Sequence, residues 1–221
     1  MQADETPFPA AWWGQGLDDV RPRVGTYGRY PHRDLPPLPF EMRKDFAWLR
    51  IQPSRSDNVA RERPTENEEA LPALLQQAAA RGLAIPSEFV EFFRSPELQQ
   101  RIRSCTDCFL DLSSVFVPSP VADGFLLRFL ADSQGCIFWY LYLLPGAAGH
   151  CVVASPDFYG AAAEQWQEEP ADPDQIVFCE QSFERFLCRF WLENEIWYCG
   201  YEKRPLFAEG RQYLESYGGT A

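Results

Sequence analysis

The stretch from residue 125 to residue 156 constrains the fold of this chain more than any other part of it. Three runs of aromatic and β-branched residues are separated there by two turn sequences, DSQG at 132–135 and PGAAG at 145–149. Glycine allows positive φ and proline fixes φ at a turn entrance, whereas aromatic and β-branched side chains favour strands. The pattern predicts three antiparallel strands connected as a meander.

The middle run of this meander, residues 136–143, is apolar on both sides. Its alternate side chains would face opposite ways: Cys136, Phe138, Tyr140 and Tyr142 on one side, and Ile137, Trp139, Leu141 and Leu143 on the other. Neither side suits water, so we expect the sheet to be covered on both faces. Hydrophobic residues make up 46% of the chain, which is enough for such a core.

A helix is expected before the meander. Thr65 and Glu68 form a capping box, which favours a helix start at that point. Pro72 would either kink this helix or mark its true first turn, because proline lacks the amide that the helix interior needs. In both cases the helix should end at Gly82.

Four further elements complete the predicted fold. Helices are expected over residues 86–94 and 182–198, both with phenylalanines at helical spacing. Residues 109–117 suit one or two short strands, and residues 175–179 suit a last strand. On the last helix we expect the polar side chains to face solvent: Glu184, Arg185, Arg189, Glu193, Asn194 and Glu195. Helices before and after a meander indicate an α+β fold.

Residues 1–64 differ in composition from the rest of the chain. The first 65 residues contain 9 of the 19 prolines, which excludes a long helix or a central strand there. They also contain too many tryptophans, tyrosines and phenylalanines for a free tail. We expect an irregular extension that packs onto a domain formed by residues 65–221. One strand is expected at residues 46–51, and residues 52–64 are expected to be a polar linker.

Acidic residues dominate the second part of the chain. The net charge is −12, and residues 66–221 hold 10 Lys and Arg against 23 Asp and Glu. Such a field repels nucleic-acid phosphates and attracts basic proteins, so direct nucleic-acid binding is disfavoured. Apolar runs stay below the roughly 18 residues that span a membrane, and the N-terminus lacks a signal-peptide pattern. We therefore expect a cytoplasmic protein without a membrane partner.

The most acidic segment is residues 157–180, with seven carboxylates, no Lys or Arg, and one tryptophan. A tryptophan among charged residues is typical of an interface anchor inside a polar rim. The candidate partner-binding residues are Asp157, Glu164, Trp166, Glu168, Glu169, Asp172 and Asp174. The alternative is a solvated loop, because runs of charge are usually hydrated.

The seven cysteines are an odd number, and several lie in apolar patterns, which favours reduced core thiols over a disulfide framework. Cys105 and Cys108 form a single Cys-x-x-Cys, which could be half a zinc site or a redox pair. Zinc needs four ligands, and no second pair follows at a suitable spacing. We interpret both cysteines as structural thiols.

The sequence offers few side chains for acid–base catalysis, because it contains only two histidines, His32 and His150. His150 precedes Cys151 directly, but neighbours on a strand face opposite ways and cannot act together as base and nucleophile. We expect His150 to flank a turn. Phosphate-loop, dinucleotide-binding and hydrolase-elbow motifs are absent from the sequence. We expect no catalytic residue, no metal and no cofactor.

Three motifs, in order along the chain, resemble the SMI1/KNR4 family, also called the SUKH superfamily. They are IPSEFVEF at 85–92, FLADSQG at 129–135 leading into WYLYL at 139–143, and EQSFERFL at 180–187. Domains of this family combine an N-terminal helix, an apolar-Pro-x-x-aromatic helix start, a β-meander and a closing Ser-Phe-x-x-Phe-Leu helix. The resemblance covers about residues 65–200.

This resemblance implies a non-enzymatic protein-binding domain, in bacteria often an immunity protein that holds a toxin, frequently a nuclease, inactive in the cytoplasm. The acidity of residues 66–221 agrees with that function, because an acidic inhibitor can mimic nucleic acid on a basic nuclease. Two alternatives stay open. One is a cytoplasmic interaction scaffold that docks through residues 1–64, and the other is an enzyme whose site the sequence does not reveal.

Overall fold

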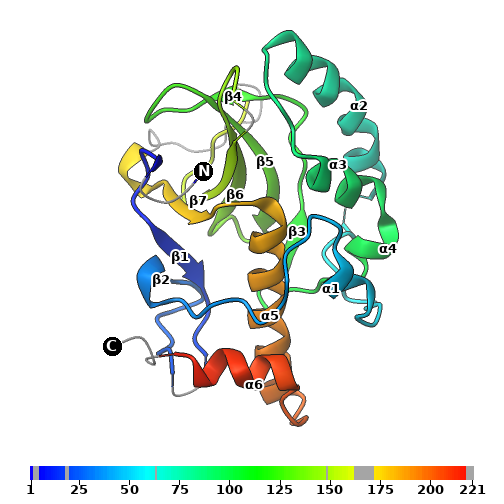
Figure 1. The fold of residues 1–221 in the computed structure, drawn as a ribbon, viewed down its shortest axis with the longest axis vertical. Helices are drawn as coiled ribbons and strands as arrows, with labels where there is room; N and C mark the ends of the chain where they lie inside the picture. The colour runs from blue at the N-terminus through cyan, green and yellow to red at the C-terminus, as the bar shows by residue number, and fades with distance from the viewer. Residues whose placement is uncertain (2–4, 18–19, 63, 148, 162–171, 218–221) are drawn as a thin grey trace.

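A computed structural model describes residues 1, 5–17, 20–62, 64–147, 149–161 and 172–217 of the chain (Figure 1). The fold is α+β, as predicted, and it is built on a six-stranded antiparallel sheet. Five strands follow the order β3-β5-β6-β7-β8, and β4 also pairs with β5. The strands are β3 (Cys108–Leu110), β4 (Val117–Pro118), β5 (Phe125–Asp132), β6 (Phe138–Leu143), β7 (His150–Ser155) and β8 (Val177–Glu180).

The predicted meander is confirmed as β5, β6 and β7. Gly135 (φ 71°) and Gly146 (φ 72°) supply the positive φ at its two turns. At the first turn, Asp132 Oδ1 accepts hydrogen bonds from the amides of Gln134 (2.9 Å) and Cys136 (3.1 Å). All six residues of β6 are buried, which confirms that neither face of this strand meets water.

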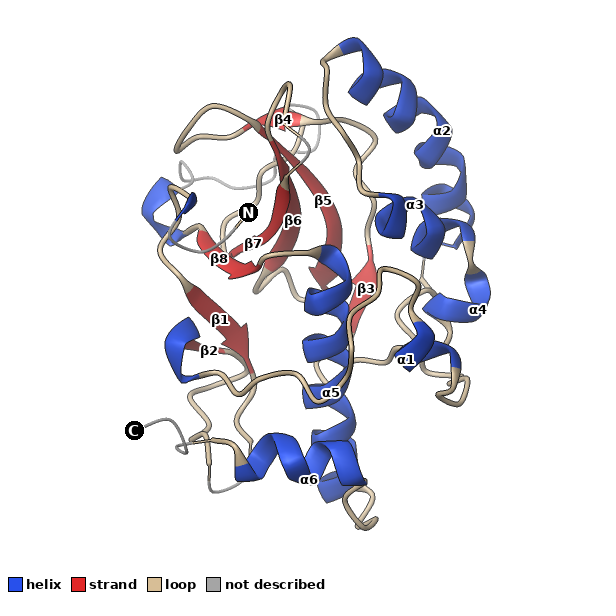
Figure 2. Cartoon of the chain, in the orientation of Figure 1, coloured by secondary structure: helices blue, strands red, loops and turns tan. Residues whose placement is uncertain are grey.

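Helices cover one face of the sheet and loops cover the other (Figure 2). On the helical face, the ring of Trp139 lies 6.2 Å from Phe186 of the long helix α5 (Phe183–Tyr201). On the opposite face, the ring of Phe138 lies 5.2 Å from Phe158, which belongs to the loop after β7. The alternation of β6 therefore divides the interior into two hydrophobic clusters.

The first long helix, α2 (Pro64–Ala80), begins one residue before the predicted capping box and continues through Pro72. Proline costs little at the first helical position, but Pro72 removes one main-chain hydrogen bond from the helix interior. The side chains of Thr65 and Glu68 lie outside what the structure describes, so the capping box stays a prediction. The chain leaves the helix at Gly82, as expected, with φ at 65°.

The next two helices, α3 (Ser87–Arg94) and α4 (Pro96–Gln99), are separated by Ser95. α3 confirms the helix predicted over residues 86–94, and its three phenylalanines are buried against the sheet and α5. Ser95 caps α4, because its Oγ accepts a hydrogen bond from the amide of Leu98 at 3.4 Å.

Strand β3 lies at one edge of the sheet. Polar groups from two neighbouring segments form hydrogen bonds with its outward-facing backbone groups. Asn67 of α2 donates its Nδ2 to the carbonyl of Leu110 (3.0 Å) and accepts from the amide of Leu112 (2.8 Å). The amide of Leu110 donates to the carbonyl of Val59 (2.8 Å). Because these backbone groups already have partners, this edge does not present a free ladder for a further strand.

The N-terminal extension packs onto the rest of the chain, as predicted. It forms a hairpin of β1 (Ala11–Gly14) and β2 (Gly28–Pro31). The hairpin lies beside β8, where the amide of Phe178 donates to the carbonyl of Pro9 at 2.9 Å. Trp12 of β1 is only 1% exposed and belongs to the main core. The hairpin itself was not predicted.

The expectation of a strand at residues 46–51 is wrong, because residues Ala47–Arg50 form the short helix α1. Glu184 of α5 accepts hydrogen bonds from the amides of Lys44 (2.6 Å) and Phe46 (3.0 Å). Both residues have positive φ, 63° and 55°, so the backbone turns instead of extending. Val59 and Ala60, inside the expected linker, are buried, while a domain boundary at residue 64 stays a prediction.

The predicted closing helix is confirmed as α5, and the hydroxyl of Ser182 caps it by accepting from the amide of Arg185 (3.4 Å). The expectation that its polar side faces solvent is wrong for the residues that are at most 3% exposed: Glu184, Arg189, Glu193, Asn194 and Glu195. The N-terminal extension and α6 (Ala208–Glu215), a helix that we did not predict, supply partners for that side.

Candidate binding surface

The acidic segment is described only in part. Glu164, Trp166, Glu168 and Glu169 lie outside the described residues, so their role stays a prediction. The other three predicted residues, Asp157, Asp172 and Asp174, lie close together: Asp157 Oδ2 accepts from the amide of Asp172 (2.6 Å). Asp172 Oδ1 accepts in turn from the amide of Asp174 (3.0 Å) and caps a short 3₁₀ turn.

Through these hydrogen bonds, two of the three aspartates stabilise the structure of the loop. Asp157 and Asp172 fix the backbone of the loop, whereas the carboxylate of Asp174 accepts from no backbone amide of the described residues. Asp172 and Asp174 are both exposed, and Asp157 is half-buried. All three aspartates therefore lie where they contribute to an acidic surface.

A polar cleft of about 490 Å³ lies on the loop-covered face of the sheet. An ion pair lines it, in which Arg128 Nε of β5 donates to Asp111 Oδ2 at 2.7 Å. The ring of Phe158 lies 4.5 Å from the Arg128 guanidinium carbon. We did not predict this pair, although an arginine inside the apolar run FLLRFLAD must find an acidic partner when that strand is buried.

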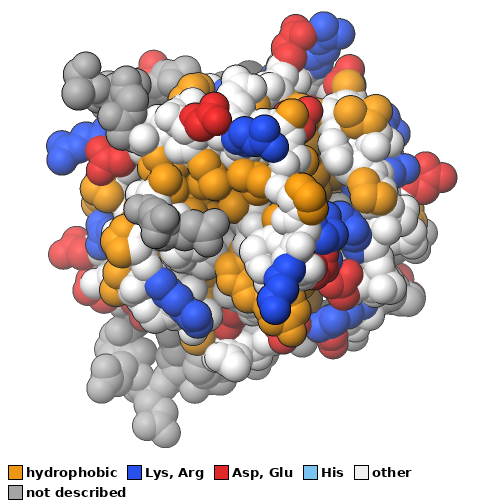
Figure 3. Space-filling model, turned by 90° about the horizontal axis from the view of Figure 1, so that it is seen from below, with side chains coloured by type: hydrophobic (Ala, Val, Ile, Leu, Met, Phe, Trp, Pro, Cys, Tyr) orange, Lys and Arg blue, Asp and Glu red, His pale blue; other side chains and the backbone are white. Residues whose placement is uncertain are grey.

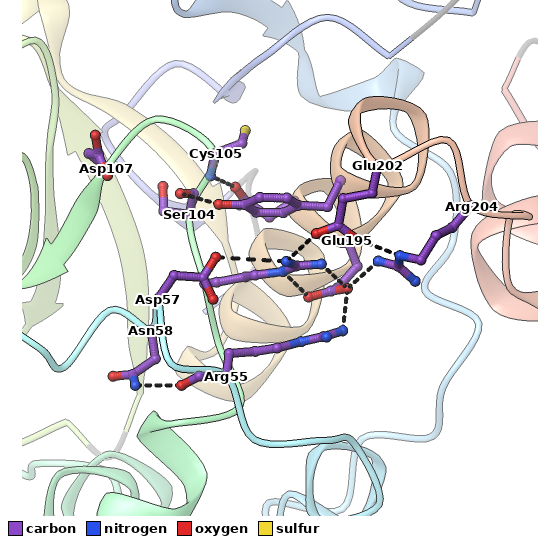
Figure 4. Close-up of polar contacts among 12 residues, drawn as sticks. Arg55, Asp57, Asn58, Ser104, Cys105, Asp107, Glu195, Glu202 and Arg204 are labelled. Atoms are coloured by element: carbon purple, nitrogen blue, oxygen red, sulfur yellow. Dashed lines mark hydrogen bonds and ion pairs between the residues drawn. The ribbon is translucent and has the colours of Figure 1, made fainter.

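A cluster of charges joins four segments beside the second half of α5 (Figure 4). Arg103 donates to both carboxylate oxygens of Glu195, at 2.8 and 3.1 Å, and to Glu202 at 2.8 Å. Arg55 and Arg204 also reach Glu195, at 2.8 and 3.9 Å. Glu195 was predicted to be solvated, but it is the buried centre of this cluster, and three arginines compensate its charge.

Three carboxylates in and beside this cluster lie at the surface. The side chains of Asp57, Asp107 and Glu202 are 41%, 69% and 33% exposed. Each faces an arginine: Asp57 lies 3.7 Å and Glu202 2.8 Å from Arg103, and Asp107 lies 2.9 Å from Arg61. Their attraction for a basic partner is therefore partly cancelled. In the acidic segment Glu180 is paired with Arg185 and Arg189, whereas Asp157, Asp172 and Asp174 have no arginine or lysine partner among the described residues.

A second buried network holds the N-terminal extension and α6 against α5. Arg21 and Glu193 form a two-pronged ion pair, and Tyr213 of α6 donates its hydroxyl to the same glutamate at 2.9 Å. Arg189 donates to that tyrosine hydroxyl at 2.8 Å and to Glu180 of β8 at 2.9 Å. The buried polar side chains of α5 therefore already have partners inside the protein.

The two cysteines of the Cys-x-x-Cys motif are poor nucleophiles. Burial raises the pKa of Cys105 to about 12 and that of Cys108 to about 11, so both thiols stay protonated near neutral pH. The sulfur of Cys108 lies 3.2 Å from the hydroxyl of Tyr27. In the part of the chain that the structure describes, no group of three or more His, Cys, Asp or Glu side chains is arranged to hold a metal ion.

His150 is the first residue of β7, next to a turn as expected, and it supports the start of α5. Its Nε2 accepts a hydrogen bond from the amide of Phe183 at 3.1 Å. Burial, with the nearby positive charges of the chain terminus and Lys44, lowers the pKa of His150 to about 4. Cys151 belongs to the hydrophobic cluster on the other face, so the two side chains do not form a dyad.

A stacked aromatic pair, with Trp197 half-buried and Tyr201 exposed, marks the end of α5. The rings of Trp197 and Tyr201 are stacked, with centroids 5.0 Å apart and an interplanar angle of 14°, and Tyr201 is 72% exposed. They border a shallow groove of about 250 Å³ over Leu17 and Ile196. Figure 3 shows hydrophobic side chains gathered on the face at this end of the molecule.

Among the described helices, none combines the length and the apolar character that crossing a membrane requires. No family model, curated protein or solved structure matches the chain.

Proposed function

We propose that this chain is a non-enzymatic protein-binding domain of the SMI1/KNR4 type, an immunity protein that neutralises a basic, nuclease-like toxin in the cytoplasm. The acidic segment at residues 157–180 would face the partner, and the protein would act by covering the basic surface of the toxin. The order of the three sequence motifs and the observed α+β arrangement support this proposal.

The main support for this proposal is that the buried arginines are paired with buried carboxylates. Each fully buried arginine faces a buried carboxylate, in the pairs Arg21–Glu193, Arg103–Glu195, Arg128–Asp111 and Arg189–Glu180. Because these pairs cancel inside the protein, most of the net charge of −12 is carried by surface residues, although Glu88, Asp132 and Glu184 are buried as well. A surface field of one sign raises the rate at which an oppositely charged protein associates.

The state of the reactive side chains favours binding over catalysis. The α5 carboxylates of Glu193 and Glu195 each accept hydrogen bonds from arginine and are at most 3% exposed. A general acid or base needs access to substrate and a proton to exchange. The described thiols and His150 are buried as well, except for Cys136 and the partly exposed Cys105.

A scaffold that docks through residues 1–64 has less support. That extension contributes Trp12, Arg21 and Phe46 to the interior, so these groups already have partners within the chain. A docking segment would need such anchors to be free for the partner.

The proposal is tested by capture from a lysate of the source cells, with the purified full chain as bait at 50 and 300 mM salt. We expect a basic nuclease as the main captured protein at low salt, in near-equal amount to the bait, and reduced capture at high salt. Recovery of an acidic or neutral partner at both salt concentrations contradicts the proposal, as does turnover of that partner by the bait.

A further inference from the structure

A second cleft lies away from the acidic segment, between α2 and the α3–α4 corner. Its volume is about 440 Å³, within the range of small-ligand sites. Leu71 of α2 and Phe93 of α3, each 3% exposed, provide apolar lining at its base. An apolar group of the size of a leucine or phenylalanine side chain would bury its surface there.

The rim of this cleft is basic, in contrast to the net charge of the chain. Arg94, in the last turn of α3, is exposed and has no ion pair or hydrogen bond among the described residues. Arg61 also lines the cleft, and it pairs with Asp107 at 2.9 Å and with Glu62 at 3.1 Å. A planar guanidinium without a partner is suited to a carboxylate, which it can bind with two parallel hydrogen bonds.

A buried amide supplies a third recognition group. Gln99 is 6% exposed, and its Nε2 donates to the carbonyls of Phe92 (2.9 Å) and Phe93 (3.1 Å). Those two bonds fix the orientation of the amide and leave its Oε1 as the acceptor. Among the described residues this oxygen has no donor, and Gln99 lines the cleft. An acceptor with no donor among the described residues can receive a hydrogen bond from a ligand that brings an N–H group.

We propose that this cleft binds the carboxyl-terminal residue of a partner polypeptide when that residue is apolar. The terminal carboxylate would pair with Arg94, the apolar side chain would lie on Leu71 and Phe93, and the terminal N–H would donate to Gln99 Oε1. Inorganic phosphate offers neither the apolar group nor the N–H donor. A fatty acid lacks the N–H donor.

The test uses the tetrapeptide acetyl-Ala-Ser-Ala-Leu with a free carboxylate and the same peptide with a terminal amide. Binding to the full chain is followed by NMR shifts of the backbone amides of α3 and α4. We expect saturable shifts with the free acid and at least about tenfold weaker binding of the amide, because the charge-assisted pair with Arg94 is lost. Replacing the terminal leucine with glycine should weaken binding by a similar factor.

A matched pair of variants locates the site. Arg94→Gln should reduce the affinity for the free acid about tenfold, while Arg81→Gln, which removes an exposed arginine beyond the end of α2, should leave it unchanged. Both positions are exposed, so the variants should fold. Equal binding of the acid and the amide, equal effects of the two variants, or no shifts up to 10 mM peptide would each overturn the proposal. Capture of a basic toxin through the acidic segment does not depend on any of these results.

Discussion

Arg21 and Glu193 are 172 positions apart in the chain and form a two-pronged ion pair in the interior, with N–O distances of 2.7 and 2.5 Å. The two side chains are 3% and 1% exposed. One lies in the loop after β1 and the other on α5, so this pair joins the N-terminal extension to the central helix. The extension therefore behaves as part of the core and not as an appended tail.

Removing one member of this pair should strongly destabilise the protein. Arg21→Met leaves the Glu193 carboxylate buried without its main partner, and we expect a loss of about 3–5 kcal/mol in the free energy of unfolding, measured with urea. Arg29→Met, at an exposed position of β2, is the control and should cost less than about 0.5 kcal/mol. The double variant with Glu193→Met should recover part of the loss. Equal stability of the Arg21 variant and the control would contradict the described role.

The stability of the fold should fall with acid through His150. The pKa of this histidine is 6.5 when unperturbed and is lowered to about 4 in the folded protein, chiefly by burial. Between these values the unfolded chain binds a proton that the folded chain does not, so stability is complete above pH 6.5 and is lost as the pH falls towards 4. The full effect is at most about 3 kcal/mol.

The variant His150→Gln separates this effect from other acid-sensitive groups. A glutamine oxygen can still accept from the amide of Phe183 but does not titrate in this range. Urea unfolding at pH 7, 6, 5 and 4 should therefore show the wild type losing stability relative to the variant as the pH falls. Parallel stability curves for the two proteins would rule out His150 as the cause.

Glu184 should control the conformation of the segment before α1. Its carboxylate holds the amides of Lys44 and Phe46, both at positive φ. We expect Glu184→Ala to leave two amides without an acceptor and to cost about 2 kcal/mol or more. Hydrogen exchange should accelerate at the amide of Phe46, whereas Glu184→Gln, which keeps an acceptor, should lose less protection. Unchanged exchange in the alanine variant would contradict the assignment.

One cysteine should react faster with thiol reagents than the other six. Cys136 is exposed, Cys105 is partly exposed, and the remaining five are buried. Burial keeps the Cys105 thiol protonated, with its pKa at about 12, so it should react slowly at pH 8. We expect one rapid equivalent with Ellman's reagent in the native protein and none in Cys136→Ser. Two rapid equivalents would show that the region around Cys105 opens.

The meander and the closing helix were predictable because their signals are local. The alternation along residues 136–143 requires two covered faces, and Ser182 stands directly before a helical run of phenylalanines. Turn glycines such as Gly135 carry their own conformational preference. These features depend on neighbours within a few positions of the chain.

The features that the sequence predicted wrongly depend on partners that are distant in the chain. Glu193 and Glu195 look like a solvated helix face until Arg21 and Arg103 are placed beside them. The left-handed conformation at Lys44 and Phe46 is stabilised by Glu184, about 140 positions later, so local propensity could not reveal α1. The arginine of β5 was the one clear signal of a buried ion pair in the sequence itself.

The most direct test of the central claim is the association rate of the captured basic partner with a charge-neutralised acidic segment. The variant carries Glu168→Gln, Glu169→Gln, Asp172→Asn and Asp174→Asn, which keep hydrogen-bond acceptors. The control removes the same charge with Glu41→Gln, Glu62→Gln, Glu97→Gln and Glu215→Gln, at exposed positions elsewhere. We predict about tenfold slower association for the acidic-segment variant at low salt, a smaller difference at 300 mM salt, and little change for the control. Equal rates for the variant and the control would contradict the claim that this segment faces the partner.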